Sequence, residues 1–96
     1  MEQNIYKMVV DCLQPYLLEL NNNETIHPET KVYASGSTLN SLYFIRLVVD
    51  LEEVVFDKFG KQIVIANEKA LSMKQSPFRT VQSLTDYITL LLNAHE

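Results

Sequence analysis

The stretch that decides the fold is residues 39–53, which read LNSLYFIRLVVDLEE, together with its continuation to Phe59. When successive residues are placed about 100° apart, as in an α-helix, the apolar positions form two adjacent stripes. The first stripe comprises Phe44, Leu47, Val48, Leu51, Val55 and Phe59, and the second comprises Leu42, Ile45, Val49 and Phe56. One stripe is enough to pack a helix into a small bundle. The second stripe therefore either contacts another helix or is offered to a partner.

The same periodicity gathers polar side chains beside the second stripe. They fall in a wedge about 80° wide that contains Tyr43, Arg46, Asp50, Glu53 and Asp57. Gly60 follows the last helical position and is expected to end the helix in the left-handed conformation. The segment from Asn40 to Phe59 is thus predicted to be one long helix with two apolar faces and one charged edge.

The first twenty residues also follow a helical period. The apolar positions are Ile5, Met8, Val9, Cys12, Leu13, Tyr16, Leu17 and Leu20. Pro15 conflicts with this pattern because it lacks a backbone N–H, so a kink or a restart of the helix is expected there. The run Asn21-Asn22-Asn23 is expected to end the helix, since asparagine side chains compete for backbone hydrogen bonds.

The rest of the chain predicts one long loop and two further helices. Residues 21–40 form a polar connection whose apolar side chains can anchor it to a core. Ile63-Val64-Ile65 is interpreted as an apolar linker that covers the core, and residues 68–74 as a short helix. Thr80 is expected to cap the last helix, which has Val81, Leu84, Tyr87, Ile88 and Leu91 on one face. The predicted fold is an all-α, four-helix bundle in a single domain, residues 1–96.

Composition excludes several classes of function. The chain has 96 residues, with 8 Lys and Arg against 12 Asp and Glu and a net charge of −4, which disfavours binding to nucleic acid. The single cysteine, Cys12, lies in an apolar stripe, and the two isolated histidines, His27 and His95, do not make a metal-ligand set. No glycine-rich phosphate loop is present, so an enzyme is not expected. Neither a secretory signal nor a membrane span is visible, which predicts a cytoplasmic protein.

One junction remains as a candidate site. The polar loop runs directly into the long helix at Asn40-Ser41-Leu42. The first backbone N–H groups and the positive end of the helix dipole favour an anion at this position. From the residues alone, however, Asn40 or Ser41 is better explained as a helix cap.

Residues 39–53 resemble the attachment site and second helix of acyl carrier proteins, in which D-S-L precedes an apolar helix that ends in L-E-E. Residues 78–88, FRTVQSLTDYI, resemble the last helix of that family, so the resemblance extends from about Val32 to the end of the chain. It implies a four-helix carrier in which 4′-phosphopantetheine is esterified to Ser41 and bears an acyl or aminoacyl group as a thioester. Ser35 and Ser37 are the nearby competitors.

The resemblance also implies partners. They would be a phosphopantetheinyl transferase and the enzymes that load or condense the acyl or aminoacyl group, bound by a monomeric carrier. The docking residues that it implies on the second helix are Leu42, Ile45, Arg46, Val49, Asp50 and Glu53. The N-S-L-Y-F-I form favours a specialised pathway (polyketide, nonribosomal peptide or amino-acid loading) over housekeeping fatty-acid synthesis.

Two other classes of protein stay open. Asn40 stands where the family has aspartate, which motivates an unmodified carrier-like fold that acts as an interaction adaptor. A small helical DNA-binding domain is the other class, and the excess of acidic residues disfavours it.

Overall fold

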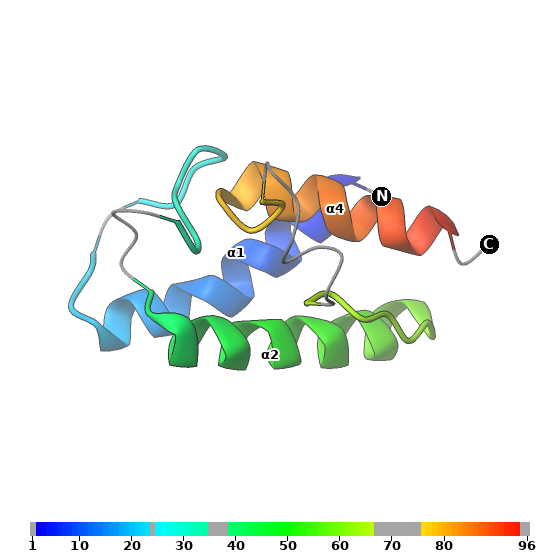
Figure 1. Cartoon of the computed structure of the whole chain (residues 1–96), viewed down its shortest axis with the longest axis horizontal. Helices are drawn as coiled ribbons and strands as arrows, with labels where there is room; N and C mark the ends of the chain where they lie inside the picture. The colour runs from blue at the N-terminus through cyan, green and yellow to red at the C-terminus, as the bar shows by residue number, and fades with distance from the viewer. Residues whose placement is uncertain (1, 24, 35–38, 67–75, 95–96) are drawn as a thin grey trace.

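The computed structural model describes residues 2–23, 25–34, 39–66 and 76–94. These residues form three helices, α1 (Glu2–Glu19), α2 (Ser41–Phe59) and α4 (Val81–Ala94), and no strand (Figure 1). The all-α prediction is confirmed for this part of the chain. The described residues hold three helices rather than the four expected, because the short helix predicted for residues 68–74 lies outside them.

Helix α1 continues through Pro15, so the expected alternative of a helix that restarts at that residue is wrong. Pro15 and Asp11 are both exposed, and water can therefore bond the Asp11 carbonyl that loses its N–H donor. The helix ends as predicted at the asparagines. Asn21 takes a left-handed φ of 61°, and the Asn22 N–H donates to the Leu17 carbonyl at 2.8 Å. This is the hydrogen-bond pattern of a Schellman cap.

Helix α2 matches its prediction at both ends. Asn40 is the N-cap, and Gly60 closes the helix with φ 66° and an N–H that donates to the Phe56 carbonyl at 2.9 Å. Of the first predicted stripe, Phe44, Leu47, Val48, Leu51 and Val55 are buried, and Phe59 is partly buried. We call the five buried residues the core stripe.

The long loop before α2 is held against the start of α4. The N–H of Val32 donates to the Arg79 carbonyl at 2.8 Å, and the N–H of Val81 donates to the Thr30 carbonyl at 2.9 Å. Thr80 caps α4 as predicted, since its hydroxyl accepts from the Ser83 N–H at 3.1 Å. In its described residues, the loop is therefore an ordered segment anchored by backbone bonds.

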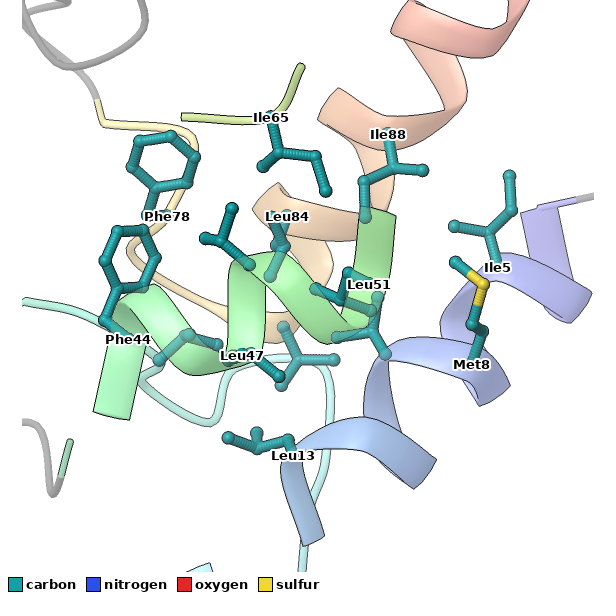
Figure 2. Close-up of a cluster of buried hydrophobic side chains, with 14 of the residues drawn as sticks. Ile5, Met8, Leu13, Phe44, Leu47, Leu51, Ile65, Phe78, Leu84 and Ile88 are labelled. Atoms are coloured by element: carbon teal, nitrogen blue, oxygen red, sulfur yellow. The ribbon is translucent and has the colours of Figure 1, made fainter. Parts of the chain in front are cut away.

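Helix α1 contacts both α2 and α4, and the core lies among the three helices. Figure 2 shows side chains from all three around this core, with Leu51 of α2 near Leu84 and Ile88 of α4. The linker after α2 covers the core, because Ile63 and Ile65 are buried while Val64 points outward. Glu52 fixes the position of this linker, because its Oε2 accepts a hydrogen bond from the Ile65 N–H at 2.8 Å. The predicted role of this linker is confirmed.

Candidate functional site

Ser41 is the first residue of α2, and its side chain is exposed. The structure resolves which residue caps the helix: Oδ1 of Asn40 accepts from the Tyr43 N–H at 3.0 Å. Because Asn40 performs the capping, the Ser41 hydroxyl is not needed for it. The first turn of α2 holds no acidic side chain. The positive end of the helix dipole next to Ser41 is therefore not offset by a neighbouring carboxylate in that turn.

An apolar groove opens beside Ser41. Its volume is about 380 Å³, and it is lined by Tyr33, Ser41, Phe44, Ile45, Val48, Val49 and Ala66. Tyr33 forms one wall by stacking on Phe44, with ring centroids 4.5 Å apart and planes 7° from parallel. Sequence reasoning did not place Tyr33 or Ala66 here. Both reach the groove through the folding of distant segments, and no local pattern marks them.

The second apolar stripe of α2 is exposed. Leu42 is 62% exposed, Ile45 58%, Val49 47% and Phe56 55%. We call these four residues the exposed stripe. Of the two alternatives that the sequence left open, packing against another helix is not seen for these residues in the part of the chain that the structure describes. Ile45 and Val49 also line the groove, so the exposed stripe begins beside Ser41 and is continuous with it.

Asp50 differs from its prediction. It was expected to be an exposed docking acid, but it is only partly exposed and accepts a hydrogen bond from the Tyr16 hydroxyl of α1. That bond raises the pKa of Tyr16 to about 12, since losing the phenol proton would place two negative charges together. Asp50 thus joins α1 to α2, whereas Glu53 and Asp57 are exposed as expected.

Arg46 is exposed, as its predicted docking role requires, and two tyrosine rings position it. Its guanidinium carbon lies 5.6 Å from the ring centroid of Tyr16 and 5.9 Å from that of Tyr43. These rings meet edge to face at 5.9 Å. The Tyr43 hydroxyl donates to Oε1 of Glu19 at 3.1 Å, and this bond raises the pKa of Tyr43. Sequence analysis missed this cluster because Tyr16 and Glu19 belong to another helix.

The other chemically active side chains are dispersed. The Cys12 thiol is partly buried, and its pKa is raised to about 11, first by burial and then by the carboxylates of Asp50 and Asp11. Such a thiol is a poor nucleophile. His27 caps a local turn, with Nδ1 accepting from the Glu29 N–H at 3.2 Å. Within the described ranges, no three His, Cys, Asp or Glu residues gather as a metal site.

Two predicted competitors for Ser41, Ser35 and Ser37, lie outside the described residues, as does His95. In the part of the chain that the structure describes, no helix is long and apolar enough to cross a membrane.

Comparison of the chain with models of protein families, with curated proteins and with solved structures finds no match. The candidate site therefore consists of Ser41, the groove beside it and the exposed stripe, and its interpretation depends on this chain alone.

Proposed function

We propose that the protein is a carrier in which Ser41 is esterified by 4′-phosphopantetheine and which presents an acyl or aminoacyl group to biosynthetic enzymes. The observation that carries the proposal is the position of Ser41. It is an exposed hydroxyl at the first residue of a helix whose cap is supplied by its neighbour Asn40. A phosphodiester at this position is favoured by the helix dipole and meets no acidic side chain in the first turn.

The residues around Ser41 fit such a group. The groove starts at Ser41 and is lined mainly by aliphatic and aromatic side chains, which suit an apolar chain attached there. When bound, phosphopantetheine supplies the thiol that holds the cargo as a thioester. The protein's own residues position the attachment point, shield part of the arm and offer a surface to the enzymes that use it.

The exposed stripe supports the docking part of the proposal. A carrier has to be recognised by its transferase and by its loading and condensing enzymes, and each of them must reach Ser41. Leu42, Ile45 and Val49 are exposed within two and a half turns of that serine. An apolar strip that starts next to the attachment point provides this recognition without a catalytic cleft.

The charge around the stripe favours a specialised pathway over housekeeping fatty-acid synthesis. Asn40 and Arg46 make the start of α2 less acidic than the family pattern. Asp50 is partly buried and accepts a hydrogen bond from Tyr16. The remaining free acids of the wedge, Glu53 and Asp57, lie toward the end of α2.

The proposal is tested by intact-mass measurement. The protein is incubated with coenzyme A and a broad-specificity phosphopantetheinyl transferase, and the wild-type chain is expected to gain the mass of one phosphopantetheine group. Ser41→Ala is expected to gain nothing, whereas the matched variants Ser35→Ala and Ser37→Ala are expected to be modified like wild type. An unchanged mass with several such transferases contradicts the carrier function. It would favour an unmodified adaptor that uses only the exposed stripe.

A further inference from the structure

The exposed stripe carries charges of opposite sign along one edge. Arg46 lies near its beginning, and Glu53 and Asp57 lie toward its end, all three exposed. With a rise of about 1.5 Å per residue, Glu53 is roughly 10 Å and Asp57 roughly 16 Å from Arg46 along the helix axis. Both separations exceed the Debye length of ~8 Å at physiological salt, beyond which exposed charges are largely screened from one another. The two ends of the edge therefore present distinct charges.

The positive end is held in place by α1. Arg46 rests against the rings of Tyr16 and Tyr43, a contact worth about 0.5–1 kcal/mol at an exposed site. Such a contact orients the guanidinium without neutralising it. The carboxylates closest to these rings, Asp50 and Glu19, accept hydrogen bonds from the two phenols. Both bonds join α1 to α2.

A groove opens at the negative end of the exposed stripe, near Glu53 and Asp57. This second groove, with a volume of about 460 Å³, is lined by Val49, Glu52, Glu53, Phe56, Asp57, Gln62 and Ile63. Its walls thus combine two residues of the exposed stripe with three carboxylates. A lysine or arginine suits such a groove, because its aliphatic stem packs on apolar side chains while its charged head meets the acids.

We propose that the exposed stripe docks a partner protein with a bipolar contact surface, acidic opposite Arg46 and basic opposite Glu53 and Asp57. This inference rests on the proposed carrier function for the identity of the partner as an enzyme that acts at Ser41. The proposed partner differs from a uniformly basic one, which the net charge of −4 alone would favour. Arg46 selects against a basic side chain near Ser41.

The size of the surface indicates a transient complex. A stable interface draws about 20–30 residues from each partner, whereas this surface offers the four residues of the exposed stripe and their charged neighbours. A permanent second copy of the chain is therefore a poorer occupant than a partner that binds and leaves. Rapid exchange also suits a carrier that visits several enzymes in turn.

The test uses two synthetic amphipathic helical peptides with the same apolar face. The bipolar peptide has glutamates at one end and lysines at the other, and the basic peptide has lysines at both ends. Each is titrated into isotopically labelled, unmodified full-length protein and followed by NMR. We expect about fivefold tighter binding of the bipolar peptide, with shifts at Leu42, Ile45, Val49 and Phe56. We expect Arg46→Glu to reverse the preference and Glu53→Lys to weaken the binding of both peptides.

Several outcomes overturn the inference. Tighter binding of the basic peptide by wild type would show that net charge decides, and an unchanged preference in Arg46→Glu would remove the role of Arg46. Shifts outside the exposed stripe, or no binding of either peptide, would deny the docking surface. A concentration-dependent dimer mapped to this stripe by sedimentation and NMR would assign it to a second copy. Because the protein is unmodified, failure of Ser41 modification leaves these results interpretable.

Discussion

The two apolar stripes of α2 have nearly the same chemistry and opposite environments. Leu51 of the core stripe is fully buried, whereas Ile45 of the exposed stripe keeps 58% of its surface in contact with solvent. The difference does not come from hydrophobicity, since both are large aliphatic residues. It comes from what lies opposite: in the described ranges, α1 and the linker residues Ile63 and Ile65 cover one stripe and leave the other open. A helical period thus identifies apolar faces without saying which of them the fold uses.

The largest effect is expected when one residue from each stripe is truncated. Leu51→Ala removes a fully buried side chain and should lower the free energy of unfolding by about 2–5 kcal/mol. Ile45→Ala, its matched control on the exposed stripe, should change it by no more than about 0.5 kcal/mol. Urea unfolding followed by circular dichroism measures both values. Similar losses in the two variants would mean that the exposed stripe is part of the core.

The sequence alone predicts those features of the fold that depend on neighbouring residues, and not those that depend on contacts between distant segments. The helices and the caps at Asn40, Gly60 and Thr80 were predictable because hydrophobic period and capping are local properties. The exposure of the second stripe was not, since it depends on which elements pack against α2. The bond from Tyr16 to Asp50 joins residues 34 positions apart, and no local pattern marks it.

The candidate site divides in the same way. Ser41 and the docking residues Leu42, Ile45 and Val49 could be proposed from one continuous stretch of sequence. The groove could not, because Tyr33 and Ala66 reach it from segments on either side of α2. The full exposure expected for Asp50 was not found for a related reason: helical periodicity puts Asp50 on a polar edge, but that edge faces α1 at this point.

A smaller effect is expected when a charge is placed on the exposed stripe. Val49→Asp should leave the midpoint of unfolding nearly unchanged and slow phosphopantetheine transfer to Ser41 about tenfold, equivalent to about 1.4 kcal/mol of lost docking energy. Leu90→Asp is the matched control, since Leu90 is 63% exposed on α4. Equal rates in both variants would show that transfer does not use the exposed stripe, and unfolding of Val49→Asp would place Val49 in the core.

The smallest effect concerns the polar edge between the two stripes. Tyr16→Phe deletes the hydrogen bond to Asp50 and should lower the free energy of unfolding by about 0.5–1.5 kcal/mol at neutral pH. Because folding raises the pKa of Tyr16 from about 10 to about 12, the folded chain keeps this proton where the unfolded chain loses it. The advantage of wild type over Tyr16→Phe is therefore complete below pH 10 and is lost as the pH rises toward 12. A difference that stays constant across this range would contradict the assigned bond.

The central claim is that Ser41, exposed beside the groove and the exposed stripe, is the attachment point of a phosphopantetheine arm. The most direct test is to digest the protein after treatment with transferase and coenzyme A, and to locate the added group by tandem mass spectrometry. We expect a single modification on the peptide that contains Asn40-Ser41-Leu42, with fragment ions that assign it to Ser41. An unmodified digest, or a group located on any other residue, would contradict it.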